Sequence, residues 1–278
     1  MTDETATSNE TPGPEPTSRP ARSDAGLFDL TGKVAVVTGG SRGLGRAMVE
    51  AFARNGADVV IASRKQEACD LLAARVAAAT GRTALGVACH VGSWDDCDEL
   101  HRVVYDRFGR CDILVNNAGM SPLYDSLESV GQELFDKVLA VNLRGPFRLS
   151  ARFGASMVEH GGGSIINVSS IAAVKPTPNE AAYGAAKAGL NNITTSFARA
   201  YAPTVRVNCI MPGPFLTDIS KAWDMDQFAE RARRDIPMRR GGQPEEVVGA
   251  ALYFGSDASP YTTGAVLKID GGAAFSPA

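Results

Sequence analysis

Short runs of β-branched residues alternate with longer segments of helical spacing along most of this chain. The first run, Lys33–Thr38, is followed by a glycine-rich turn and by a helical segment, Arg46–Asn55, which ends at Gly56. A short, continuous run of this kind is typical of a strand that is buried on both faces. Equivalent runs predict further strands at Asp58–Ser63, Thr83–Val91, Asp112–Asn116, Ser164–Ser169, Val205–Ile210 and Ala265–Asp270.

Helical spacing fills most of the intervals between these runs. The predicted helices are Gln66–Thr80, Trp94–Phe108, Leu134–His160 with an expected break near Gly145-Pro146, and Ala181–Tyr201. Strands that alternate with helices of this length form a parallel sheet with right-handed crossovers. The pattern therefore predicts an α/β fold, a single doubly wound parallel sheet of the Rossmann type with helices on both faces.

The first residues have a different texture. Residues 1–26 contain Thr, Pro, Glu, Ser and Gly and almost no large apolar side chain. Such a segment cannot bury enough surface to offset its ordering entropy, so we expect a flexible tail. No linker interrupts the remaining residues, and we expect 27–278 to form one domain.

Composition narrows the class of protein. The chain has 278 residues, 44% of them hydrophobic, and a net charge of −3. These values are ordinary for a globular protein and give no electrostatic case for nucleic-acid binding. No apolar stretch is long enough to span a bilayer, and the polar, acidic N-terminus does not resemble a signal peptide. We therefore expect a cytoplasmic protein without a membrane or nucleic-acid partner.

Cysteine and histidine usage agrees with that expectation. The five cysteines are scattered and form no CxxC pair, which favours reduced, buried thiols in the cytoplasm. The three histidines show no metal-ligand spacing, so we predict no metal site.

The turn Thr38–Gly45, with the sequence TGGSRGLG, lies between the first predicted strand and the first predicted helix. Glycines there let the backbone turn sharply and let a pyrophosphate approach the helix N-terminus, whose free N–H groups favour negative charge. In this strand–turn–helix context the turn predicts a dinucleotide site. The residues predicted to contact the cofactor here are Gly39, Ser41, Arg42, Gly43, Leu44 and Gly45.

The end of the second predicted strand bears on which dinucleotide binds. An acidic residue that would hold an NAD ribose is expected there, but the chain has Ser63 and Arg64, and Asp58 lies at the opposite end. Arg42 and Arg64 could instead hold a 2′-phosphate, which suits guanidinium geometry. Ser63 and Arg64 are therefore predicted to contact the cofactor as well. The alternative is two solvated surface arginines. We predict NADP(H) as the preferred cofactor, with NAD(H) still possible.

Tyr183 and Lys187 are four residues apart in a helical pattern, so they share one face of the helix. A nearby ammonium favours the phenolate and lowers the pKa of a tyrosine. The pair is therefore suited to general acid/base work on a carbonyl or an alcohol.

Taken together, these features resemble the short-chain dehydrogenase/reductase family in its compact, single-domain form. The resemblance runs from about Leu27 to Gly272. The motifs that carry it, in chain order, are TGGSRGLG, Asn116–Gly119 (NNAG), Asn142, Ser170, Tyr183-x-x-x-Lys187 and Pro212-Gly213.

The resemblance implies roles for the candidate catalytic residues. Tyr183 would be the proton donor and acceptor, and Lys187 would lower its pKa and hold the nicotinamide ribose. Ser170, which lies 13 residues before Tyr183, would bind the substrate oxygen and stabilise developing charge. Asn142 would hold a water that links Lys187 to solvent. The alternatives are strand-end capping for Ser169 and Ser170 and a buried structural amide for Asn142.

Further cofactor contacts follow from the same resemblance. Asn117, Ala118 and Gly119 would flank the adenosine ribose, and Pro212, Gly213 and Thr217 would lie near the nicotinamide, with Thr217 binding its carboxamide. A helix N-cap is the alternative for Thr217.

The adenine contact departs from the family pattern. His90 stands where the family commonly has the aspartate that accepts a hydrogen bond from the adenine amino group, and Val91 could pack on the ring. Only a neutral imidazole can accept that bond, so a pH-dependent cofactor affinity is one hypothesis.

Substrate identity is not fixed by the sequence. The segment Pro214–Pro237 mixes Phe215, Trp223, Met225 and Phe228 with charges, and it resembles the family's mobile lid. Its arginines Arg231, Arg233 and Arg234 could meet an acidic substrate or form an exposed helix face. A 3-oxoacyl thioester, a sugar acid or polyol, and a hydrophobic cyclic ketone all remain open.

We therefore predict an NADP(H)-dependent oxidoreductase that interconverts a carbonyl and a secondary alcohol by Tyr–Lys–Ser catalysis. The rival hypothesis is a nucleotide-binding regulatory or scaffold protein on the same fold, without turnover. A dehydratase or epimerase is a third. The resemblance also implies a homodimer or homotetramer, paired through Leu134–His160 and Ala181–Tyr201, with a second contact near Val266–Ala278.

Overall fold

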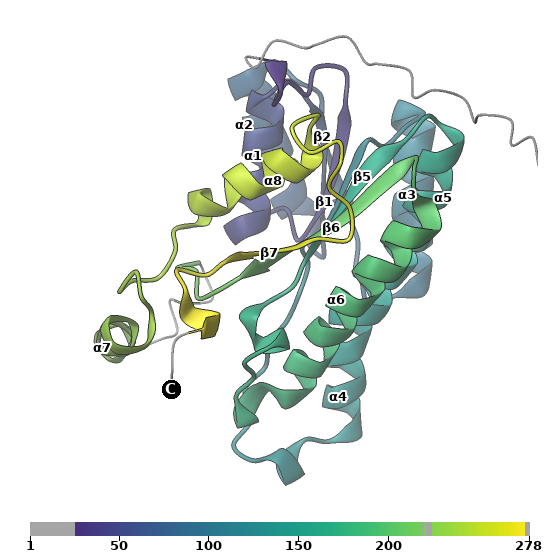
Figure 1. Cartoon of the computed structure of the whole chain (residues 1–278). Coiled ribbons are helices and arrows are strands. Elements are labelled where there is room, and N and C mark those ends of the chain that lie inside the picture. The colour runs from purple at the N-terminus through teal and green to yellow at the C-terminus, as the bar shows by residue number, and fades with distance from the viewer. Residues whose placement is uncertain (1–25, 218–219, 221–223, 276–278) are drawn as a thin grey trace, which may run out of the picture.

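The structure is a computed structural model that describes residues 26–217, 220 and 224–275. Except for Gly26, the predicted tail lies outside these residues, as does Trp223. Seven parallel strands form one sheet in the order β3-β2-β1-β4-β5-β6-β7, which confirms the predicted doubly wound topology (Figure 1). The strands are β1 (Val34–Thr38), β2 (Asp58–Ser63), β3 (Ala84–Ala88), β4 (Ile113–Asn116), β5 (Gly163–Val168), β6 (Val205–Pro212) and β7 (Val266–Ile269).

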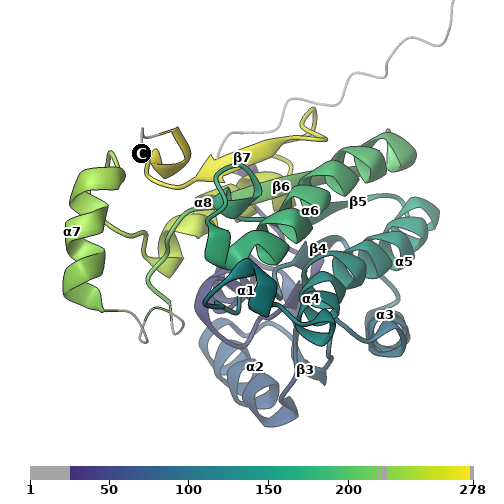
Figure 2. The ribbon, with the colours of Figure 1, turned by 90° about the horizontal axis from the view of Figure 1, so that it is seen from below.

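Helices cover both faces of the sheet (Figure 2). They are α1 (Gly43–Arg54), α2 (Gln66–Thr80), α3 (Trp94–Phe108), α4 (Gln132–Leu139), α5 (Gly145–Glu159), α6 (Ala181–Tyr201), α7 (Met225–Asp235) and α8 (Val248–Gly255). One core cluster joins the sheet to α1, α2 and α8, and a second joins it to α3, α5 and α6.

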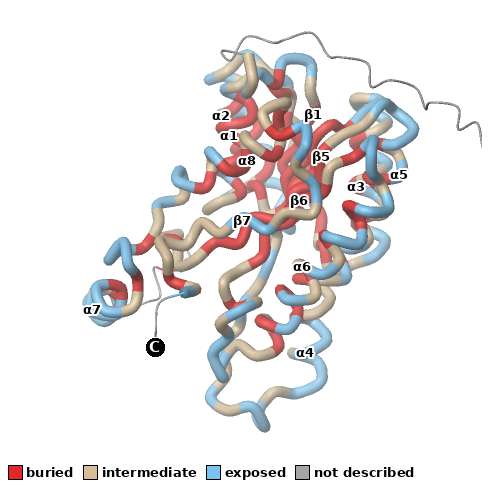
Figure 3. Tube along the Cα trace, viewed as in Figure 1, coloured by how far each residue is buried: buried red, intermediate tan, exposed pale blue. Residues whose placement is uncertain are grey.

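The central strands explain why these apolar runs form a sheet. Every residue of β1 and β4 is buried, and the middle of the sheet is red in Figure 3. Val36 pairs in register with Val60 on one side and Leu114 on the other. Alternate residues of such a strand feed the cores on opposite faces. The runs of valine and isoleucine are therefore the residues that both layers of helices cover.

The structure corrects the predicted helix Leu134–His160. Instead of a break at Gly145-Pro146, a π-helical segment over Ala140–Arg144 joins α4 to α5. Pro146 lies in the first turn of α5, where a missing N–H is tolerated. A π turn carries an extra residue and often lies at a functional site, and this one contains Asn142.

Other boundaries also differ. The third strand is shorter than predicted, and α1 begins at Gly43, inside the glycine turn. The sequence reading missed α8 because its short sequence, VGAALYFG, is apolar on nearly all sides and has no periodic pattern. It packs against α1 and β5 in the first core cluster.

The carboxyl ends of the strands lie at one edge, with α4, α7 and the N-terminal end of α6 beyond it (Figure 1). The chain runs outward from β1 to β3 on one side and from β4 to β7 on the other. Ligands of doubly wound sheets bind where the strand order reverses in this way, which here is between β1 and β4. Among the described residues, no helix is both long and apolar enough to cross a membrane.

Candidate active site

The turn after β1 is built for close backbone approach. Gly39 and Gly43 have φ angles of +64° and +53°, which favour glycine. A Cβ on Gly45 would lie 2.3 Å from the carbonyl oxygen of Gly39, so no side chain fits there. Arg42 occupies the N-cap of α1, and its side chain makes no capping bond. The free N–H groups of α1 and the open turn therefore fit a dinucleotide pyrophosphate.

Thr38 fastens this turn to the segment after β4. Its hydroxyl accepts hydrogen bonds from the backbone N–H groups of Asn117 (3.0 Å) and Ala118 (3.1 Å). The amide of Asn117 in turn donates to the Thr38 carbonyl at 2.9 Å. The predicted cofactor residue Asn117 thus shapes the site through its side chain, and sequence reasoning missed Thr38. Its one signal was a hydroxyl at a strand end directly before the glycines.

Both predicted arginines lie at the end of β2 or beside it. The N–H of Gly40 donates to the carbonyl of Ala62 at 3.3 Å, which brings the turn with Arg42 next to the segment with Arg64. Both guanidinium groups are exposed, and neither forms an ion pair within the described part of the chain. Asp58 is engaged with Arg82 at 2.9 Å, at the opposite end of the strand.

His90 lies in a tight turn after β3. Its backbone N–H donates to the carboxylate of Asp96 at 2.9 Å, and the Ser93 hydroxyl donates to the same carboxylate at 2.7 Å. These bonds hold the pKa of Asp96 below its usual range. The ring of His90 lies against Gly92, where a Cβ would be 2.8 Å from Cε1. Val91, which is predicted to pack on the adenine ring, is buried beside His90.

Tyr183 and Lys187 lie on α6 beside the end of β5. The ammonium of Lys187 is buried, donates to the carbonyl of Val168 at 2.7 Å, and lies 5.7 Å from the centre of the Tyr183 ring. The two serines after β5 differ in role. Ser169 is buried and donates to the backbone carbonyl of Lys187 at 3.2 Å. Ser170 instead caps a short helix (Ile171–Ala173), and its hydroxyl acts to lower the pKa of Tyr183.

Burial sets the ionisation of this pair. It lowers the pKa of Lys187 to about 8, and the nearby thiol of Cys209 in β6 acts in the opposite direction. Burial also raises the pKa of Tyr183 to about 12. The Ser170 hydroxyl acts to lower this pKa, and the charge of Glu180 acts to raise it. The predicted lowering of the Tyr183 pKa by Lys187 is therefore not seen here. The buried ammonium is turned to Val168, and desolvation of the phenol dominates.

Asn142 is fully buried in the π-helical segment. Its amide donates to the carbonyls of Met120 (2.8 Å) and Val138 (3.0 Å) and accepts from the Met120 N–H at 3.2 Å. A Cβ on Gly119 would lie 3.0 Å from the Asn142 oxygen and 3.6 Å from Lys187 Nζ. At Gly119 the loop after β4 therefore passes between the side chains of Asn142 and Lys187. The hydrogen bonds of the Asn142 amide to Met120 and Val138 also give Asn142 a structural role.

The segment after β6 closes toward the glycine turn. Gly213 lies against Asp270, after β7, and the methyl group of Thr217 would be 3.5 Å from a Cβ on Gly43. Asp224 caps α7, because its carboxylate accepts from the first N–H groups of that helix. Apart from Ser220, the residues directly after Thr217 lie outside the described residues, so its predicted N-cap alternative stays open. Leu216 and Ile171 pack against a cluster formed by Phe228 and Ala232 of α7 and by Ile236 and Ala273 outside it.

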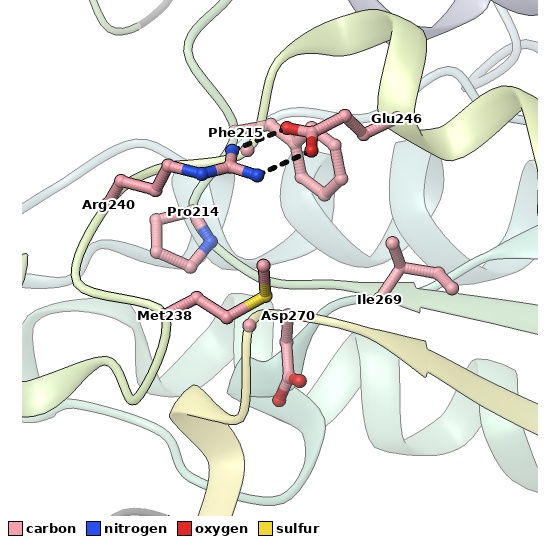
Figure 4. A pocket seen from close by; sticks show the side chains of 9 residues that line it. Pro214, Phe215, Met238, Arg240, Glu246, Ile269 and Asp270 are labelled. Atoms are coloured by element: carbon pink, nitrogen blue, oxygen red, sulfur yellow. Dashed lines mark hydrogen bonds and ion pairs between the residues drawn. The ribbon is translucent and has the colours of Figure 1, made fainter.

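The arginines of α7 (Arg231, Arg233 and Arg234) are exposed, which is the second of the two predicted possibilities. A cavity of about 80 Å³ lies behind the same segment (Figure 4). Pro214, Phe215, Met238 and Asp270 line it, and an ion pair of Arg240 with Glu246 at 2.6 Å borders it. None of the candidate catalytic residues lines this cavity, so it is separate from the candidate catalytic centre.

Comparison with known proteins agrees with this geometry. The profile of the family described as enoyl-(acyl carrier protein) reductase matches residues 39–274. Human dehydrogenase/reductase SDR family member 4 is 36% identical over 245 residues, which cover 87% of this chain and 88% of that protein. NAD-dependent glycerol dehydrogenase from Listeria innocua is 35% identical over 246 residues, 88% of this chain and 95% of that one. The solved structure of NADPH-dependent 3-quinuclidinone reductase from Rhodotorula rubra matches with a TM-score of 0.87 at 31% identity, covering 94% of this chain and 99% of that one.

Proposed function

The chain belongs to the short-chain dehydrogenase/reductase family, and we propose that it is an NADP(H)-dependent oxidoreductase that interconverts a carbonyl and a secondary alcohol. One observation carries the proposal. Lys187 lies beside Gly119 and 5.7 Å from the centre of the Tyr183 ring, whose pKa Ser170 influences, at the sheet edge that also holds the glycine turn of α1. An acid/base pair next to a dinucleotide cradle is what hydride transfer to a carbonyl requires.

The preference for NADP(H) is inferred from this chain's own arginines, because its relatives include both an NAD-dependent and an NADPH-dependent enzyme. Arg42 and Arg64 would hold the 2′-phosphate, in the absence of a carboxylate at the end of β2. The turn Gly39–Gly45 would hold the pyrophosphate. His90, Val91 and Asn117–Gly119 would flank the adenosine, and Pro212, Gly213 and Thr217 the nicotinamide. When bound, the cofactor supplies or accepts the hydride.

The catalytic side chains handle the proton and the oxygen. In reduction, the Tyr183 hydroxyl donates its proton to the carbonyl oxygen, and in oxidation it takes the proton back. Ser170 donates a hydrogen bond to the same oxygen and stabilises its developing charge. Lys187 keeps a positive charge beside the phenol and binds the nicotinamide ribose. Asn142 holds the backbone of Met120 through hydrogen bonds and lies beside Gly119. That Asn142 also binds a water linking Lys187 to solvent stays a prediction.

The cofactor choice has a direct test. Steady-state reduction of one ketone is measured with NADPH and with NADH, for the wild type and for the double variant R42A/R64A. We expect the wild type to favour NADPH and the double variant to lose that preference. A wild type that favours NADH would contradict the cofactor assignment and leave the carbonyl chemistry standing.

The setting and the assembly are also proposals. All five cysteines are free and buried, which fits a cytoplasmic enzyme. A homodimer through α5 and α6 would cover Phe147, and a tetramer would use β7, whose Val266 and Leu267 are more than a third exposed. Size-exclusion chromatography with light scattering tests this, and a monomer would contradict it.

A further inference from the structure

Glu180 lies next to the face of α6 that carries Lys187 and Tyr183. It is the N-cap of the helix, three positions before Tyr183, and Lys187 follows Tyr183 by four positions on one helix face. Glu180 ends a short helix, Pro178–Glu180, that runs directly into α6. Exposure changes from a buried Lys187 to a half-buried Tyr183 and Glu180. Glu180 thus lies at the mouth of the site that holds Lys187 at its base.

Across the part of the chain that the structure describes, the carboxylate of Glu180 has no partner of its own. Although half-buried, its side chain forms no hydrogen bond or ion pair within residues 26–217, 220 and 224–275. Its charge does act on the catalytic phenol, because it helps to raise the pKa of Tyr183. Glu180 is the N-cap of α6, three residues before Tyr183, so its carboxylate lies near enough for its charge to act on the phenol.

Two lysines of this region each donate to a backbone carbonyl. Lys175 donates to the carbonyl of Ala273 at 3.3 Å. Lys187 donates to Val168. The adjoining wall is apolar, since Ala172 and Pro176 lie against Gly184 on the same face of α6. Within the described residues, Glu180 thus has no ion-pair partner beside Tyr183, and an apolar wall adjoins it.

We propose that Glu180 is a specificity-determining residue, whose carboxylate accepts a hydrogen bond from a hydroxyl or ammonium group next to the substrate's carbonyl. The same charge disfavours substrates that carry a carboxylate at that position. The inference rests on the proposed function and narrows its substrates to hydroxyketones or aminoketones. It excludes 2-oxo acids.

Four ketones of one carbon skeleton test the proposal: butan-2-one, 1-hydroxybutan-2-one, 1-aminobutan-2-one and 2-oxobutanoate. Their kcat/KM values with NADPH are measured for the wild type, for Glu180→Gln and for Glu159→Gln. Glu159 is an exposed carboxylate at the end of α5 with no role in the proposed site, and it serves as the matched control.

We expect the wild type to favour the hydroxyl and ammonium compounds over 2-oxobutanoate. Glu180→Gln should reduce the ratio of kcat/KM for the aminoketone to kcat/KM for the oxo acid by about tenfold or more. The variant no longer attracts the ammonium of the first substrate or repels the carboxylate of the second. Glu159→Gln should leave that ratio unchanged. A ratio that changes less than fivefold in Glu180→Gln, or a wild type that favours 2-oxobutanoate, overturns the proposal.

Binding to NADP⁺-loaded protein, where no reduction takes place, separates this inference from the proposed function. Ligand-observed NMR gives the dissociation constants of the same four ketones for all three proteins. If turnover is absent but the ketones bind in the expected order and Glu180→Gln abolishes that order, the inference stands and the proposed function fails. If Glu180→Gln leaves the order of binding unchanged, the inference fails whatever the turnover.

Discussion

The ammonium of Lys187 donates to the carbonyl of Val168 at 2.7 Å and lies 5.7 Å from the centre of the Tyr183 ring. A buried cation with a single backbone acceptor is costly to the fold, and burial lowers the pKa of Lys187 to about 8 for that reason. The side chain is therefore held in place at the expense of stability, next to the residue that it serves in the proposed reaction.

Replacing Lys187 by methionine should stabilise the protein at pH 7 and abolish turnover. The folded-state pKa of about 8 lies below the usual 10.5, so the unfolded chain binds more protons between these values. The penalty of the buried charge is full below about pH 8 and disappears as pH rises toward 10.5. We expect Lys187→Met to gain about 1–3 kcal/mol in unfolding free energy at pH 7.

Urea unfolding of the protein without cofactor at pH 7 and pH 10 measures this difference. The gain should shrink at the higher pH. A variant that is less stable than the wild type at pH 7 would show that the ammonium is well solvated or well paired in the folded protein.

The rate of ketone reduction should depend on the charge of Lys187. As pH rises through about 8, the ammonium loses its proton, and the positive charge beside Tyr183 is lost. We expect kcat/KM with NADPH to fall by up to about tenfold per pH unit above that value, since this quantity reports groups of the free enzyme. A profile that stays flat to pH 10 would argue against a role for this charge.

Replacing glycine by alanine should have opposite effects on stability at Gly45 in α1 and at Gly249 in α8. Gly45→Ala would put a Cβ 2.3 Å from the Gly39 carbonyl oxygen, so we expect loss of dinucleotide binding and a lower melting temperature. Gly249, in α8, has open space at the same position. Gly249→Ala should stabilise the helix by about 0.5–1 kcal/mol and leave binding unchanged. Thermal melting with and without NADPH measures both, and equal behaviour of the two variants would refute the steric argument.

Removing Arg42 or Arg64 should weaken NADPH and spare NADH. Each guanidinium is exposed and unengaged within the described residues, so its loss leaves no partner stranded. A charge-assisted contact with a 2′-phosphate is worth about 1.5–3 kcal/mol, or roughly 10- to 100-fold in the dissociation constant. Fluorescence titration gives both constants, and Arg199→Ala on α6 is the control. Parallel losses for the two cofactors would indicate a general charge effect.

The sheet could be predicted because β-branched runs such as those of β1 and β4 are buried on both faces and carry their pattern locally. The helix α8 and the π-helical segment at Asn142 escaped prediction for different reasons. The first is apolar on nearly all sides, and the second depends on packing between α4, α5 and the loop after β4. No periodicity reports such packing.

The candidate site shows the same division. Tyr183 and Lys187 could be found from helical spacing and a family resemblance, and their placement together agrees with that reading. The clamp formed by Thr38 and Asn117 joins residues 79 positions apart, which the sequence cannot reveal without the fold. The pKa of Tyr183 was predicted with the wrong sign, because the burial that raises it is a property of the folded protein.

The most direct test of the central claim follows NADPH absorbance with a panel of carbonyls, for the wild type and Tyr183→Phe. The panel holds 3-oxoacyl thioesters, keto-sugar acids, hydroxyketones and cyclic and aromatic ketones. We predict consumption by the wild type on at least one of them and a loss of about 10²- to 10⁴-fold in the variant. Equal consumption by both proteins would contradict the assignment of Tyr183. Tight NADPH binding without consumption of any carbonyl would contradict the proposed oxidoreductase and favour a nucleotide-binding regulatory protein.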